Sequence, residues 1–218
     1  MALSKVDFNN INVTPAASKK LKWNSSANGF ETGDVGGSMV LLSTQTASSS
    51  STISFTSGID STYDEYVFKY YDIHPQTNQA HFQFQADTGT NTNYNQTITS
   101  TSFVSYMNEA GDTAGIVYDG NYDQAQGTAF QHVGKEVNGD NDGSCAGTLT
   151  IYQPSSSTFV KHFMLRTQGY VAPSSGTDFS QDLFIAGYFN TTTPLTRFQF
   201  KMSTGNIDSG VIKLYGVS

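Results

Sequence analysis

The last nine residues of the chain, Gly210-Val-Ile-Lys-Leu-Tyr-Gly-Val-Ser218, alternate in the way that is typical of a β-strand. Strand side chains point to opposite faces with a period of two, so Ile212 and Leu214 are predicted to face a core and Lys213 the solvent. The preceding segment, residues 203–210, is dense in turn formers. We therefore expect the chain to close a sheet with a hairpin-like pair of strands.

The same alternation recurs downstream of residue 37. The longest β-rich run, residues 63–73, carries aromatic or aliphatic groups on both faces, which favours a central strand of a sandwich. Further segments with strand character cover residues 38–44, 52–57, 80–86, 94–107, 148–153, 158–167, 182–189 and 197–202. About nine or ten short strands without a sustained helical period predict an all-β fold, a jelly-roll-like β-sandwich.

Residues 80–86 show the alternation most clearly. Phe82 and Phe84 are predicted to face the core, while His81, Gln83 and Gln85 are predicted to face the solvent.

Residues 1–36 lack the strand pattern. Residues 16–23 are expected to form two helical turns at most, and residues 24–37 have turn composition throughout. We interpret residues 1–36 as an N-terminal arm or linker that precedes a β-sandwich domain of residues 37–218. Trp23 and Phe30 are the large apolar anchors of this arm, and they are expected to dock on a partner or on the body of the protein.

Residues 108–146 have weak periodicity and predict a long loop with a short helix or strand. Long loops in compact domains are often functional. Tyr106, Tyr118 and Tyr122 lie in or beside this block among Asn and Gln residues. Aromatic and amide side chains are those that sugar-binding and protein-binding surfaces use. The three tyrosines are therefore candidate binding residues, unless they fill the core beneath the loop.

The composition is unusually poor in charge. Charged residues make up 13% of the chain, against about 25% in ordinary globular domains. Aromatic residues also make up 13%, which excludes a disordered polar chain. An uncharged polar surface combined with aromatic strands is typical of extracellular and virion β proteins.

The net charge of −7 is unevenly distributed. Residues 1–22 hold four lysines against one aspartate, a balance of +3, so the rest of the chain carries −10. An acidic body argues against nucleic-acid binding. The basic segment around Lys19, Lys20 and Lys22 either contacts an acidic partner or is solvated.

The sequence offers little catalytic or metal-binding chemistry. The single cysteine, Cys145, excludes a disulfide framework and a cysteine-rich zinc site. No two of the four histidines have metal-ligand spacing, and no nucleotide-binding or nucleophile-elbow motif occurs. Residues 138–144 resemble half a calcium loop but fit an Asn/Asp/Gly turn better. We therefore expect no metal, no cofactor and no enzymatic activity, although carboxylates that pair only in space stay possible.

The first residues lack a signal-peptide core, and no window is apolar enough for a membrane span. We expect a chain that is made in the cytoplasm and is not inserted in a membrane.

Several short sequence segments of the chain resemble a module of virion proteins from marine tailed bacteriophages. The resemblance covers about residues 37–218 and is carried by residues 42–44, 52–68, 155–162, 185–190 and 200–210, by His74-Pro75 and by the closing Ile212-Lys-Leu-Tyr-Gly216. Members of this family are structural or tail-fibre-like proteins. The resemblance implies no enzyme activity and no defined ligand residues.

The resemblance implies a virion structural protein that is made in the host cytoplasm and displayed on the particle, expected as a homotrimer. We expect a tail-fibre-like module for host recognition, with other virion proteins as partners and neither nucleic acid nor membrane insertion. Virion anchoring is assigned to Lys19, Lys20, Lys22, Trp23 and Phe30, and contact with a host-surface polysaccharide or protein to Tyr106, Tyr118 and Tyr122.

Two alternatives remain open. The short chain, without room for a fibre shaft, also suits a capsid decoration (cement) protein on the head surface. A lectin-like or carbohydrate-active tail module is the other alternative.

Overall fold

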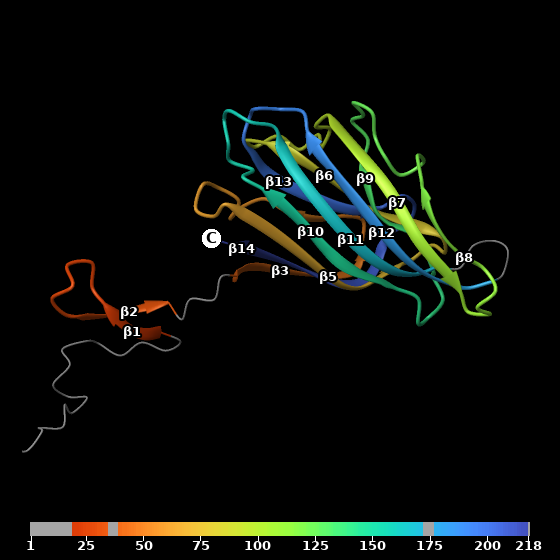
Figure 1. Cartoon of the computed structure of the whole chain (residues 1–218), viewed down its shortest axis with the longest axis horizontal. Coiled ribbons are helices and arrows are strands. Elements are labelled where there is room, and N and C mark those ends of the chain that lie inside the picture. The colour runs from red at the N-terminus through yellow and green to blue at the C-terminus, as the bar shows by residue number, and fades with distance from the viewer. Residues whose placement is uncertain (1–18, 35–38, 172–176, 218) are drawn as a thin grey trace, which may run out of the picture. The chain divides into compact units, whose positions relative to one another are not determined.

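The computed structural model describes residues 19–34, 39–171 and 177–217. All helices and strands assigned in these ranges are β-strands, of which there are 14. The chain divides into two compact units, Met1–Val40 and Leu41–Ser218. The boundary predicted between residues 36 and 37 lies outside the described residues. The all-β prediction is confirmed, with more strands than the sequence pattern indicated (Figure 1).

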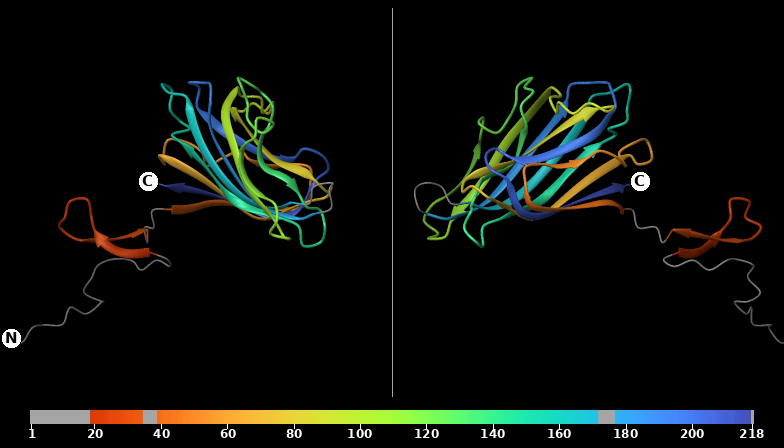
Figure 2. Two further views of the ribbon diagram at one scale, coloured as in Figure 1. Left: turned by 45° about the vertical axis from the view of Figure 1, so that its right-hand side comes forward. Right: turned by 180° about the vertical axis from the view of Figure 1, so that it is seen from behind.

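Twelve of the strands belong to one sheet that folds into two layers (Figures 1 and 2). The large layer has the order β3-β14-β5-β10-β11-β12-β7-β8, and the small layer has the order β4-β13-β6-β9. One antiparallel pair, Val171 with Val137, joins β11 to β9 and so connects the two layers. The strands of the large layer are β3 (Met39–Ser50), β5 (Glu65–Pro75), β7 (Ile98–Asn108), β8 (Ala114–Tyr118), β10 (Cys145–Tyr152), β11 (Lys161–Val171), β12 (Phe179–Phe189) and β14 (Ile207–Val217), and those of the small layer are β4 (Ile53–Phe55), β6 (Ala80–Thr88), β9 (Gln131–Val137) and β13 (Leu195–Met202).

The winding of the chain is that of a jelly roll. Strands β3, β4, β5 and β6 alternate between the layers, as do β9 and β10, and again β13 and β14. The order β3-β14-β5-β10 therefore faces the order β4-β13-β6-β9, which is the double Greek-key arrangement of this fold. Strands β7, β8, β11 and β12 widen the large layer beyond it. The predicted jelly-roll-like β-sandwich is confirmed.

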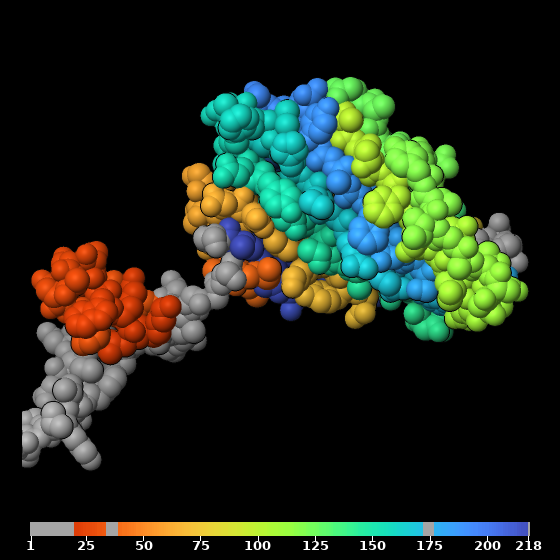
Figure 3. Space-filling view, in the orientation of Figure 1, coloured from red at the N-terminus to blue at the C-terminus, as the bar shows by residue number. Residues whose placement is uncertain are grey.

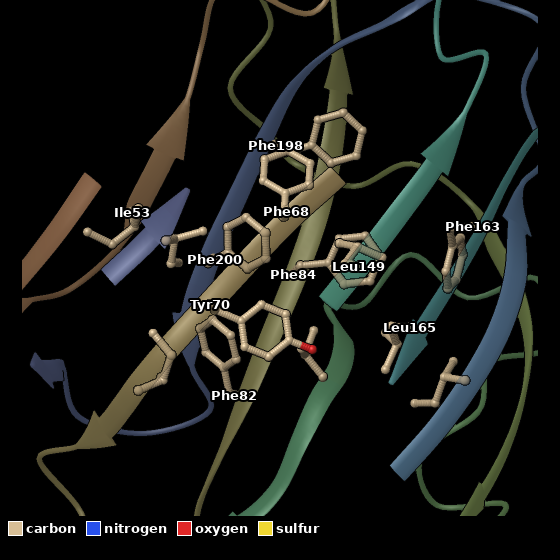
Figure 4. Close-up of a cluster of buried hydrophobic side chains, with 14 of the residues drawn as sticks. Ile53, Phe68, Tyr70, Phe82, Phe84, Leu149, Phe163, Leu165, Phe198 and Phe200 are labelled. Atoms are coloured by element: carbon tan, nitrogen blue, oxygen red, sulfur yellow. The ribbon is translucent and has the colours of Figure 1, made fainter. Parts of the chain in front are cut away.

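Phenylalanine and isoleucine are the commonest residues of the core, and phenylalanine rings contact one another between the layers. Phe68 of β5 lies with its ring centroid 5.2 Å from each of the rings of Phe55, Phe198 and Phe200, which come from the small layer. Figure 4 shows Phe68 beside Phe198 and Phe200. Tilted and edge-to-face pairs of this kind add about 0.5–1.5 kcal/mol each beyond area burial. The aromatic alternation that identified the strands thus also holds the two layers together.

The C-terminal strand confirms one prediction and corrects another. Ile212 and Leu214 are buried, and Lys213 is half-exposed, as the alternation predicts. The expected hairpin between residues 197–202 and the last strand is wrong, because β13 pairs with β4 and β6 in the small layer while β14 pairs with β5 in the large one. The turn between β13 and β14 crosses between the layers, so β14 becomes an inner strand.

The first unit contains a β-hairpin, which corrects the expectation of helical turns for residues 19–23, while residues 16–18 lie outside the described residues. Strands β1 (Lys19–Trp23) and β2 (Phe30–Asp34) pair antiparallel. The turn between them is closed by a hydrogen bond of 2.9 Å from the Asn24 amide to the Gly29 carbonyl. Lysines alternate with Leu21 and Trp23 in β1, a pattern that suits a two-faced strand better than a short helix.

Candidate binding site

The structure places the three candidate tyrosines in three different environments. Tyr118 in β8 is 63% exposed and donates a hydrogen bond to the Asp123 carboxylate. Tyr122 is only 6% exposed and packs into the core, which removes it from the candidate surface residues. Tyr106 in β7 is partly buried and faces the inner side of the large layer. The paired positions Phe103–Tyr118 and Tyr106–Gly115 put Tyr106 and Tyr118 on opposite faces of the sheet.

Tyr106 lines a pocket of about 180 Å³. Its ring lies 5.9 Å from the ring of Phe179 at an angle of 71°, and Gln181 stands directly opposite it on β12. We call this pocket the Tyr106 pocket. Its lining residues are Tyr106, Lys135, Glu136, Val171, Phe179 and Gln181. Of these six residues only Tyr106 was singled out from the sequence, because strand pairing brings the others together from distant segments.

A β-bulge in β9 directs two consecutive side chains into this pocket. Ala80 pairs with Val137 and Phe82 with Gly134, so Lys135 and Glu136 together oppose the single residue His81. Neighbouring residues of a regular strand point to opposite faces, and a bulge changes this direction. Glu136 has a left-handed φ of 44°. Its amide donates a hydrogen bond of 3.0 Å to Nδ1 of His81, which fixes the bulge.

Lys135 is held by a nearly buried ion pair. Its ammonium lies 2.9 Å from the Asp119 carboxylate, and the two side chains are 17% and 12% exposed. The same nitrogen lies 4.9 Å from the centre of the Tyr122 ring, a cation–π contact. Burial alone would raise the pKa of Asp119, but the hydrogen bond and the charge of Lys135 hold that pKa below its usual value. Lys135 therefore sits in the pocket wall with its charge already balanced.

Two neutral histidines pack beside the bulge. The ring centroids of His81 and His132 are 5.0 Å apart, and the Tyr122 ring lies against both. Burial lowers the pKa of His81, and it lowers the pKa of His132 to about 4. Nε2 of His132 lies 3.1 Å from the side-chain amide nitrogen of Gln83, which donates to it. Both rings are thus uncharged hydrogen-bond acceptors at neutral pH.

The candidate anchoring residues lie on the hairpin. Trp23 and Phe30 stand opposite each other, stack at 4.5 Å, and are 61% and 41% exposed. Leu21 shares their face, so one side of the hairpin is apolar and uncovered within its own unit. On the other face Lys22 forms an exposed ion pair of 3.1 Å with Glu31.

Lys19 and Lys20 are also assigned to virion anchoring. Lys20 is exposed, and the side chain of Lys19 lies outside the described residues. A two-stranded hairpin is marginally stable by itself in water. The uncovered aromatic face is therefore suited to packing against another surface.

The other chemical candidates do not line the Tyr106 pocket. Cys145 is buried, and burial raises the pKa of its thiol to about 12, so the thiol stays protonated. A polar pocket of about 390 Å³ near the ends of β5 and β14 includes Asp72, Asp142 and Asp208. No three His, Cys, Asp or Glu residues in the described part of the chain are arranged to hold a metal ion.

Residues 138–144 form the predicted turn, in which the Gly143 amide donates to the Asp140 carbonyl at 2.7 Å. The described residues include no helix that is long and apolar enough to cross a membrane.

Comparisons of the chain with protein-family models, with curated proteins and with solved structures found no match.

Proposed function

We propose that this chain is a non-enzymatic structural protein of a tailed-bacteriophage virion, a homotrimeric module that displays a host-recognition surface and is held on the particle by its N-terminal arm. The resemblance of residues 37–218 to phage virion modules motivates this proposal. The observation that supports it most directly is the hairpin, whose stacked Trp23 and Phe30 stay exposed within their unit. An uncovered aromatic face of this kind is typical of residues that become buried at an interface.

The body suits display because its described core residues all lie outside the arm. The buried core of the second unit is formed by residues between Ala47 and Leu214. The arm is therefore free to bind other virion proteins while the sandwich carries a binding site.

A capsid decoration protein is the second candidate, and a surface patch favours it. Phe103, Met107, Ile116 and Tyr118 lie on the outer face of β7 and β8, and each is at least 45% exposed. Figure 3 shows this face, on which the green segments around β7 and β8 adjoin the blue of β12. Such a patch fits lateral contacts with neighbouring subunits on a head lattice, and it also fits contacts within a trimer.

The position of the protein on purified particles separates the two candidates. For a host-recognition module, we expect labelled antibody to bind the tail tip and quantitative mass spectrometry to find few copies for each particle. Labelling spread over the head, with many copies, would support the decoration function instead. Absence of the protein from purified particles contradicts both.

Deletion of residues 1–36 is expected to leave the body folded and to abolish incorporation into particles. The melting temperature of the truncated protein should equal that of the full chain, because the core lies downstream of the deletion. Incorporation is measured by complementing a phage that lacks the gene. Unfolding of the truncated protein would show that Trp23 and Phe30 belong to the core.

Two point variants refine this experiment. Trp23→Ala removes half of the aromatic stack and should reduce incorporation strongly. Glu31→Gln removes only an exposed ion pair on the opposite face, which contributes about 0–1 kcal/mol, and should leave incorporation unchanged. Equal loss of incorporation in both variants would contradict docking through the aromatic face.

A further inference from the structure

We infer that the Tyr106 pocket binds one neutral pyranose unit of a glycan. This inference rests on the proposed host-recognition function and names the ligand class of that function. The pocket combines an apolar wall of Tyr106, Phe179 and Val171 with the hydrogen-bonding groups of Gln181, Glu136 and Lys135. A pyranose has the complementary character, since its ring carries a C–H face and a rim of hydroxyl groups.

The size of the pocket limits the ligand to a single ring. Its volume is about 180 Å³, whereas pockets for drug-sized ligands occupy roughly 300–1,000 Å³. The site is open to solvent, so the rest of a polysaccharide would continue outside it. A folded protein epitope could insert no more than one side chain.

The charges in the pocket favour a neutral ligand. The charge of Lys135 is balanced by Asp119 at 2.9 Å. The Glu136 carboxylate only accepts hydrogen bonds, so it suits the hydroxyl donors of a sugar and repels the carboxylate of an acidic sugar. The Gln181 amide both donates and accepts, which matches hydroxyl groups in either role.

The site is preorganised by the bulge in β9. The left-handed φ of Glu136 is a costly conformation for a residue other than glycine, and it belongs to the bulge that brings Lys135 and Glu136 to the pocket. The hydrogen bond from the Glu136 amide to His81 fixes the backbone at Glu136, and the ion pair with Asp119 fixes the Lys135 side chain, before a ligand arrives. Binding therefore requires little ordering, which is the cost that most weakens recognition of small polar ligands.

Direct binding to monosaccharides tests the inference on the full chain. The probes are D-glucose, D-galactose, D-mannose, N-acetyl-D-glucosamine and, as the acidic comparison, D-glucuronate, each followed by NMR titration at neutral pH. At least one neutral sugar should shift the ring signals of Tyr106 and Phe179, and D-glucuronate should bind at least tenfold more weakly. Absence of any neutral binder, or tighter binding of D-glucuronate, overturns the inference.

Three variants locate the binding. Glu136→Gln keeps the shape of the pocket but removes its carboxylate, and Tyr106→Ala removes the central ring of its apolar wall, so each should weaken the binding at least fivefold. Tyr71→Ala changes an exposed tyrosine of β5 that does not line the pocket and should leave the affinity unchanged. Thermal melting checks that each variant is folded. Normal binding in both pocket variants, or loss of binding in Tyr71→Ala alone, places the sugar elsewhere and overturns the assignment.

The two proposals fail separately. A protein that sits at the tail tip but binds no pyranose disproves the sugar site and leaves the display function standing. A protein that binds the sugar but is absent from particles disproves the virion function and leaves the site standing. Attachment that survives enzymatic removal of host glycans, with no pyranose binding, identifies a protein receptor and overturns the inference.

Discussion

Leu214→Asn is expected to lower the free energy of unfolding by about 3–5 kcal/mol, whereas Lys213→Ala is expected to change it by less than about 1 kcal/mol. Leu214 is fully buried and stands opposite Phe68 on β5. Asparagine of similar shape forfeits the burial of the leucine side chain and leaves an amide without hydrogen-bond partners in an apolar core. Lys213 is half-exposed, and its ammonium lies only 5.7 Å above the Tyr71 ring.

Urea unfolding of both variants beside the wild type measures this difference. The two residues are neighbours on one strand, so a shared effect on the backbone would appear in both variants. Equal stability of Leu214→Asn and Lys213→Ala would show that the faces of β14 are reversed. A partly unfolded Leu214→Asn still supports the prediction, because a loss of this size is a large fraction of typical domain stability.

The direction of each side chain in the core strands was predictable because it depends only on local sequence. The alternation of Ile212, Lys213 and Leu214 gives the face of each residue whatever strand lies beside it. The partner of a strand is not local. The sequence around residues 203–210 has turn composition, but it does not reveal that this turn crosses between layers. The predicted hairpin with β13 was wrong for this reason.

Buried polar residues made part of the small layer difficult to predict from the sequence. Gln85 was expected in solvent, yet it is fully buried, and its side-chain amide donates to the carbonyls of Gln96, Thr128 and Ala129 at 3.0–3.3 Å. The segment that covers it comes from the block that looked like a long loop. A buried glutamine can satisfy the backbone carbonyls of such a segment by donating hydrogen bonds to them. The alternation of the sequence cannot distinguish this buried glutamine from one on the surface.

The candidate site was only partly predictable for the same physical reason. Tyr106 could be found because an aromatic residue near a long polar block is an ordinary sign of a binding surface. Lys135 and Glu136 could not, since the bulge that brings both into the pocket also breaks the period of β9. The left-handed Glu136 is visible only in the folded backbone.

Acidification is expected to destabilise the body through His132, by about 3 kcal/mol between pH 7.5 and pH 4. The pKa of this histidine falls on folding from 6.5 to about 4, chiefly because the ring is buried, with His81 adding to the shift. The unfolded chain therefore binds more protons than the native protein in this range. The stabilisation is complete above pH 6.5 and is lost as the pH falls toward 4, where the ring must charge beside His81.

Comparison of variants isolates this contribution from the carboxylates, which also lose stabilisation in acid. His132→Gln stays neutral at every pH, and its new amide can still accept from Gln83. As the pH falls, the free energy of unfolding of His132→Gln, measured by urea titration, should decrease less steeply than that of the wild type. The difference in this free energy between the two proteins should shrink by about 3 kcal/mol between pH 7.5 and pH 4. His162→Gln replaces an exposed histidine of β11 and serves as the matched control, with a wild-type profile expected. Parallel profiles for the wild type and His132→Gln would show that His132 already titrates in the folded protein as it does in the unfolded chain.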